Sequence, residues 1–238
     1  MKISGWDISE AGARQWRVTI GHQSVKNNSE WVRGSQNPVL LKNNIGFKPL
    51  KIALMIKADG KQNIIQKRSD ILSRLLTPAE IELEGFEHKF FAILNKYDIN
   101  EISTERFHVL TLEFDCYEYG NEIVQNVSGQ TELNVNNPGN IVTPVQIEIR
   151  PKIGIASVTV AGICRSEIGL DLPVTIRNVE ADKVVVLDGD TGLVTQEGQL
   201  KAGEVDMWDT PSLLPGTNKI SVDTSRVDLT VRFCPRYM

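Results

Sequence analysis

Residues 211–238 read PSLLPGTNKISVDTSRVDLTVRFCPRYM, and this stretch says most about the fold. The Pro-Gly pair at 215–216 favours a tight turn, because proline presets its φ angle and glycine tolerates a positive one. Apolar residues then alternate with polar residues at 219–222 and again at 227–233. A period of two is typical of strands with one buried and one solvated face. The stretch therefore predicts two strands that are tied into a sheet.

The composition is that of an ordinary globular chain and excludes several classes of function. The 238 residues are 41% hydrophobic and 24% charged, with a net charge of -4, which argues against a nucleic-acid-binding groove. No apolar run reaches the roughly 20 residues of a membrane helix, and the N-terminus MKISGWDISE lacks a signal sequence. The three cysteines are far apart and form no CxxC pair, which predicts free thiols in a reducing compartment.

The first half of the chain predicts strands around one helix. Residues 64–76 repeat apolar side chains at helical spacing, so Leu75 and Leu76 are expected in the core. Thr77-Pro78 ends the pattern, because the residue before a proline is driven out of the α region. Alternation predicts strands at residues 16–20, 50–56, 81–83, 87–97 and 106–117. The polar residues 27–44, with a short strand at 30–33, and residues 98–104 are predicted as loops.

The second half predicts a separate β-sandwich. Its short strands are spaced by roughly 8 to 12 residues, with turn signals between them and no convincing helix. The alternation breaks near residue 120, and a polar stretch continues to Asn140. We therefore predict two domains, residues 1–125 and residues 126–238. The strand at 106–117, apolar on both faces at its start, is expected to be central or at a subunit interface.

The sequence contains no pattern that predicts a catalytic residue, a cofactor-binding residue or a metal ligand. His22, His88 and His108 each stand alone, whereas a zinc site needs several ligands at defined spacings. The DGDTG motif at 188–192 resembles the start of a calcium loop, but Gly192 stands where a ligand belongs, so a hairpin turn is favoured. No nucleophile elbow, P-loop or dinucleotide-binding motif is present.

Two other functions remain open at this point. Exposed tryptophans on a β-sandwich would make the protein a carbohydrate-binding module for host attachment, although packing is favoured for Trp208; Trp31 is the other candidate. The acidic strip of Glu80, Glu82 and Glu84 would suit a hydrolase, although a solvated strand face explains it better.

Several motifs together resemble the distal tail protein (Dit) family of phages with long, non-contractile tails. They include LKIALMIKADG before the helix, IELEGFEHKFFAIL after it, and HVLTLEFDCYEYG at the end of the first half. In the second half they include NPGNIVTPVQIEI, KVVVLDGDTGLV and SLLPGTNKI. Two departures stand out: Glu118-Tyr119 replaces the usual Pro-aromatic pair, and the family's glycine-rich N-terminal loop is not obvious.

The resemblance implies a mainly β protein with a structural role and no enzymatic activity. Its N-terminal domain, which holds one amphipathic helix, would build a hexameric ring at the tail tip of the virion, and its C-terminal domain would be a galectin-like sandwich. The expected partners are five further copies of the chain, the tail tube protein, and a tail-associated lysin, fibre or receptor-binding protein. DNA would pass through the central channel without sequence-specific contacts.

Overall fold

The computed structural model describes residues 1–30, 33–34, 39–166 and 169–238, and it divides into two compact units. The first comprises residues 1–119 with Met238, and the second comprises residues 120–237. The predicted boundary at 125/126 would cut strand β10 (Ile123–Ser128), which pairs along its whole length with β22 (Val227–Phe233) of the second unit. The division therefore lies before β10 and not inside it.

The first unit is built on one antiparallel sheet with the strand order β2-β1-β7-β8-β9-β6-β3. Its strands are β1 (Lys2–Ile3), β2 (Trp6–Asp7), β3 (Ala13–Ile20), β6 (Lys48–Lys57), β7 (Ala79–Glu82), β8 (Lys89–Ser103) and β9 (Phe107–Tyr119). A short 3-10 helix, η1 (Ile8–Ala11), joins β2 to β3. Inward-facing side chains at every second position, such as Leu50, Ile52 and Leu54 of β6, are fully buried.

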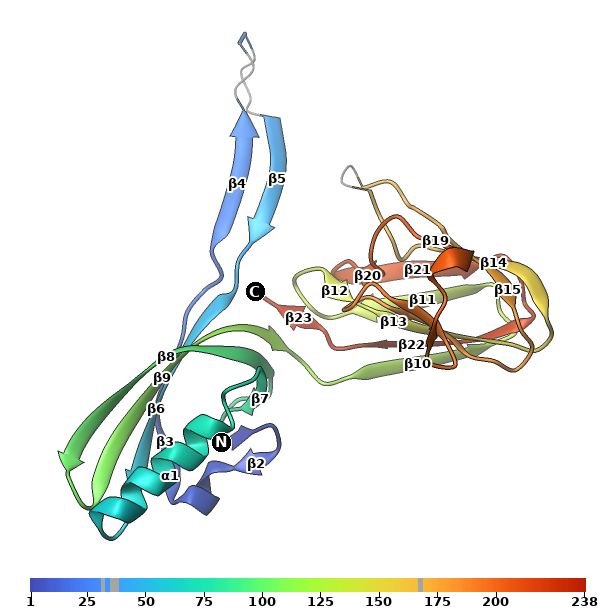
Figure 1. The fold of residues 1–238 in the computed structure, drawn as a ribbon. Helices are drawn as coiled ribbons and strands as arrows, with labels where there is room; N and C mark the ends of the chain where they lie inside the picture. Colours follow the sequence, from blue (N-terminus) through green and yellow to red (C-terminus); the bar gives the residue numbers. More distant parts are fainter. Residues whose placement is uncertain (31–32, 35–38, 167–168) are drawn as a thin grey trace. The chain divides into compact units, whose positions relative to one another are not determined.

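The helix α1 (Lys61–Ser73) covers this buried face of the sheet, and it ends earlier than the sequence predicts (Figure 1). Ile64 and Ile71 are completely buried against the sheet, and Leu75 is buried just beyond the helix. Arg74 forms the C-cap, so the chain leaves the helical spacing before residue 76. Leu76 is consequently 83% exposed, and its expected place in the core is wrong.

The strands β8 and β9 form a long hairpin, and the loop predicted at residues 98–104 is wrong for most of its length. Pairing with β9 continues to Ser103, opposite Phe107, and the turn follows at residues 104–106. Register shifts at Asn95 and Ile102 interrupt the alternation of the sequence, which is why it resembles a loop. On β9, Leu110, Leu112, Phe114 and Cys116 are buried on one face, as predicted.

A second hairpin stands where the sequence predicts a loop. The strands β4 (Val25–Glu30) and β5 (Val39–Ile45) pair with each other and, among the described residues, with no other strand (Figure 1). Their asparagine-rich sequences lack the apolar alternation that marks a half-buried strand. The short strand predicted at 30–33 includes residues 31–32, which lie outside the described part of the chain, as does Trp31.

The second unit is a sandwich of two antiparallel sheets, as predicted. One has the order β10-β22-β13-β16-β17-β18 and the other the order β11-β21-β14-β15-β19. The strands not yet given are β11 (Glu132–Asn137), β13 (Gln146–Pro151), β14 (Ile155–Ala161), β15 (Val174–Val179), β16 (Val185–Asp188), β17 (Val194–Gln196), β18 (Gln199–Leu200), β19 (Val205–Asp206) and β21 (Gly216–Val222). A small ladder joins β12 (Thr143–Pro144) to β20 (Ser212–Leu213), and β23 (Arg236–Tyr237) follows β22.

The core of the second unit lies between the two sheets and consists mostly of Val, Ile and Leu. The C-terminal stretch behaves as predicted, because β21 and β22 each bury every second side chain. The polar stretch before Asn140 contains β10 and β11, which lie at sheet edges. The side chains of both strands alternate between more exposed and less exposed positions, although their sequences are polar.

Candidate functional site

The sheet of the first unit has two long open edges. β7 pairs with β8 only from Lys89 to Ala92. Among the described strands, the rest of β8 therefore has β9 as its single neighbour. At the other side, β3 pairs with β6 and with no other strand among the described residues. The steps from β3 to β6, β9 and β8 are all antiparallel, so β3 and β8 run in opposite directions. Exposed edges offer backbone groups that a further strand can bind.

The backbone groups that face outward from β3 can be assigned from its ladder with β6. Gly21 donates its N–H to the carbonyl of Pro49 at 2.8 Å. Hydrogen-bonded pairs alternate in an antiparallel ladder, so Thr19 and Arg17 also direct their N–H groups to β6. Val18 therefore presents its N–H to the open edge.

The face of this sheet opposite α1 carries charged and polar side chains beside apolar ones such as Val109. A hollow of about 360 Å³ on this face is lined by residues of four strands, among them Trp16 at the β3 bulge, Arg17, Lys51, Asp98 and Thr111. Lys51 pairs with Glu113 at 2.8 Å, and this hydrogen bond holds the pKa of the Glu113 carboxyl below its ordinary value. Trp16 is 58% exposed. The two faces of one sheet thus differ, with a dry face under the helix and charged side chains on the opposite face.

A buried ion pair ties β6 to β9 in the first unit. The Lys48 side chain is only 4% exposed, and its Nζ lies 2.5 Å from a carboxylate oxygen of Glu118. His88 contacts the other oxygen of Glu118 at 2.6 Å. Burial raises the pKa of Glu118, but the hydrogen bonds from Lys48 and His88 outweigh it and hold the pKa below the ordinary value.

The acidic strip predicted as a solvated face is engaged in ion pairs. Lys89 binds Glu80 at 2.8 Å and Glu82 at 3.3 Å, and the Tyr119 hydroxyl also donates to Glu80. Burial opposes ionisation of Glu80, yet the hydrogen bonds from Lys89 and Tyr119 lower its pKa. Glu84 instead uses its backbone, donating its N–H to the side chain of Gln15. The strip therefore connects β7 to β8 through Lys89 and to β9 through Tyr119.

The other predicted candidates lie apart from one another. Asp188 lies in a hairpin turn between β16 and β17, as the sequence predicts. Its carboxylate accepts hydrogen bonds from the N–H of Asp190 and from the hydroxyl of Thr191. Burial raises the pKa of the Cys116 and Cys164 thiols to about 12, so both are protonated near neutral pH. Trp208 is 83% exposed, and the expectation that it packs is wrong.

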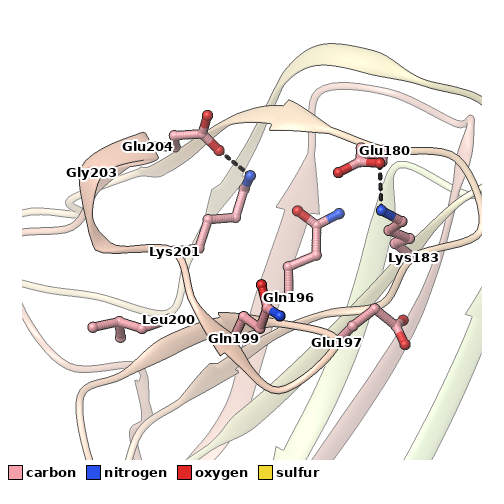
Figure 2. A pocket seen from close by; sticks show the side chains of 9 residues that line it. All are labelled: Glu180, Lys183, Gln196, Glu197, Gln199, Leu200, Lys201, Gly203 and Glu204. Carbon is pink, nitrogen blue, oxygen red and sulfur yellow. Dashed lines mark hydrogen bonds and ion pairs between the residues drawn. The ribbon is translucent and has the colours of Figure 1, made fainter.

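A polar cleft of about 410 Å³ lies in the second unit, where the β17–β18 hairpin meets the segment leading to β19 (Figure 2). It is lined by Glu180, Lys183, Gln196, Glu197, Gln199, Leu200, Lys201, Gly203 and Glu204. The 3-10 helix η2 (Ala202–Glu204) forms one wall. Sequence reasoning missed this cleft, because its residues read as solvated turns and only the fold brings them together.

In the residues that the structure describes, no three His, Cys, Asp or Glu side chains gather closely enough to hold a metal ion. No helix in the described part is long and apolar enough to cross a bilayer. His108 is buried beside Arg68, with 3.3 Å between its Nδ1 and the guanidinium. The candidate site is therefore made of surfaces, namely two sheet edges and a cleft.

Comparison with known proteins finds similar folds among solved structures. Neither the protein-family models nor the curated proteins yield a match. Among solved structures, the crystal structure of the SPP1 Dit (gp 19.1) protein is similar, with a TM-score of 0.76 and 13% sequence identity. The match covers 99% of this chain and 98% of that chain, whose structure is described as a paradigm of the hub adsorption apparatus in phages that infect Gram-positive hosts.

The baseplate of phage P2 in its activated conformation is also similar. The TM-score is 0.55 for the structure with Ca and 0.54 for that with Sr, each at 13% identity over 95% of this chain and 92% of that chain. At this identity the likeness concerns the fold. It confirms the mainly β architecture and the resemblance predicted from the sequence.

Proposed function

We propose that the protein is a non-enzymatic structural component of a phage tail tip, where six copies form a ring between the tail tube and the host-recognition apparatus. The fold, shared along nearly the whole chain with a hub protein, supports a tail role. The observation that carries the ring is the pair of open, oppositely directed edges on β3 and β8. The two edges belong to one sheet, so each copy has both halves of the contact.

These edges suit a cyclic assembly of identical copies. A contact between different patches of two copies is heterologous, and it closes into a ring when the rotation per copy divides the circle. If β3 of one copy lies beside β8 of the next, the pair is antiparallel, like every other step between β3, β6, β9 and β8. Rotation about an axis roughly along the strands preserves these directions. The ring would therefore continue one sheet through all copies.

The expected partners follow from the same role. A ring at the tail tip would receive the tail tube protein on one side and a tail-associated lysin, fibre or receptor-binding protein on the other. The similar structures are a hub protein and a baseplate, which supports this location in the virion. The face of the sheet opposite α1, with paired charges such as Lys51 and Glu113, would line the channel without binding DNA tightly.

The mass of the purified full chain in solution tests the proposal. Six copies of the 26.5 kDa chain give a particle of about 159 kDa by light scattering after size exclusion. The expected result is this mass at micromolar concentration, with a six-fold ring in electron micrographs. A stable dimer through one two-fold interface would contradict the proposal, because an isologous contact pairs the same edge of both copies and not β3 with β8.

A further inference from the structure

The chain contains two Asp-Gly pairs, at residues 59–60 and 188–189, and no Asn-Gly pair. This dipeptide can cyclise, because glycine lacks the Cβ that would hinder its backbone nitrogen from attacking the preceding carboxyl group. The nitrogen bonds to the carboxyl carbon, one water leaves, and a five-membered succinimide ring results. Hydrolysis then takes up one water at either ring carbonyl, which restores aspartate or leaves isoaspartate. No oxidant, reductant or cofactor takes part.

The fold blocks this reaction at the second pair, Asp188 and Gly189. Gly189 is buried and donates its N–H to the Val145 carbonyl at 3.0 Å. The backbone is packed so closely there that a Cβ on Gly189 would collide with the carbonyl oxygen of Pro211. The Asp188 carboxylate accepts hydrogen bonds within its own turn. The nitrogen and the carboxyl carbon therefore cannot meet unless the turn opens.

The first pair lies between β6 and α1, and it is open. Asp59 and Gly60 are both exposed, and a Cβ on Gly60 would meet no atom within 4 Å. Among the described residues, neither the Gly60 N–H nor the Asp59 carboxylate has a hydrogen-bond or ion-pair partner. Gly60 has a φ angle of 90°, which glycine adopts without strain. The two reacting groups are therefore adjacent, accessible and not engaged elsewhere.

We propose that Asp59 and Gly60 form a modification site, at which the folded chain forms isoaspartate and becomes a substrate for a protein carboxyl methyltransferase. The rearrangement routes the main chain through the side-chain carbonyl and leaves the α-carboxylate of residue 59 free. The enzyme would transfer a methyl group from the sulfonium of S-adenosylmethionine to an oxygen of that carboxylate. This chemistry is independent of the ring.

The modification would affect α1, because isoaspartate adds a methylene to the main chain just before this helix begins. The Asn63 amide donates to the Asp59 carbonyl at 3.5 Å, and Ile64 donates its N–H to the Gly60 carbonyl at 3.2 Å. Both contacts depend on the position of the backbone at residues 59–60. Ile64 is completely buried against the sheet. The modified chain should therefore lose stability in the first unit and keep it in the second.

Peptide mapping of the full chain after storage in a weakly acidic buffer tests the proposal, because water leaves most readily from a protonated carboxyl. Isoaspartate at residue 59 should exceed that at residue 188 by about tenfold or more, since a buried, hydrogen-bonded amide reacts only after local opening. A protein-isoaspartate methyltransferase with labelled S-adenosylmethionine should place its label on the same peptide. In concentrated urea, where the fold is lost, the two pairs should react at similar rates.

Asp59→Glu is the blocking variant, because it keeps the charge but would need a six-membered ring, which closes more slowly. It should remove the label from the peptide and leave the melting temperature of fresh protein unchanged. Asp59→Asn should instead speed the reaction, because an amide loses ammonia more readily than a carboxylate loses water. The proposal is overturned if residues 59 and 188 react equally in the folded chain, or if their difference persists in urea. It is also overturned if the folded chain gains no isoaspartate at residue 59 in the time that the unfolded chain needs to form it.

Discussion

In the first unit one face of the sheet is buried beneath α1 and the opposite face carries charged and polar side chains beside apolar ones, whereas in the second unit two sheets bury each other. Their edges differ as well. β3 is 8 residues long, and beyond Ala92 β8 has no second neighbour among the described strands. The edges of the second unit are β10 and β11, with 6 residues each, and β18 and β19, with 2 residues each. Short edges limit pairing with another chain and long ones permit it. The longest open edges therefore belong to the first unit.

The largest effects should come from cavities made in either core. Phe90→Ala removes a completely buried ring from the first unit and should cost about 3–5 kcal/mol. Ile147→Ala does the same in the second unit and should cost about 2–5 kcal/mol. Because the two cores share no residue, each variant should lower one calorimetric transition and spare the other. Equal shifts of both transitions by each variant would contradict this separation.

Breaking the buried ion pair should rank next and affect only the first unit. Glu118→Gln leaves the Lys48 charge, 4% exposed, without its carboxylate. Removing one partner of a buried pair typically costs about 3 kcal/mol or more, since the other charge stays desolvated. Denaturant titration of the variant measures the loss. The double variant Lys48→Met with Glu118→Leu should recover most of it, and failure to recover would assign the loss to packing.

Acid should weaken the first unit through the same carboxylates. The pKa of Glu118 and that of Glu80 are lowered in the folded state, so their contribution is complete above the ordinary glutamate pKa. It is lost as the pH falls below about 5 toward the folded-state values. Melting temperatures recorded from pH 7 to pH 3 should fall less steeply for Glu118→Gln than for the wild type. Parallel curves would show that Glu118 does not carry the effect.

The smallest effect should come from Trp208→Ala. This side chain is 83% exposed, so its removal should change the free energy of unfolding by less than about 0.5 kcal/mol. The melting transition of the second unit measures the change. A loss above about 1 kcal/mol would mean that Trp208 packs, as its sequence context suggested.

The sequence predicts those strands and helices in which buried and exposed side chains alternate at regular spacing. β21, β22 and β9 each bury one face, so the sequence predicts them as strands. The spacing of its apolar residues likewise predicts α1. The β4–β5 hairpin and the end of β8 are not, because polar residues or register shifts mask their period. The candidate site is less predictable still. The open edges depend on which strands fail to pair, and the cleft depends on a hairpin of 2-residue and 3-residue strands.

The central claim is that copies of the chain join through the open edge of β3, and a proline at that edge tests it most directly. Val18 directs its N–H outward, so Val18→Pro removes a donor from the edge without removing a bond to β6. Val18→Ala is the control for the lost side chain. Light scattering should give about 159 kDa for the wild type and Val18→Ala, and 26.5 kDa for a folded Val18→Pro. A Val18→Pro variant that keeps the wild-type mass would contradict the account.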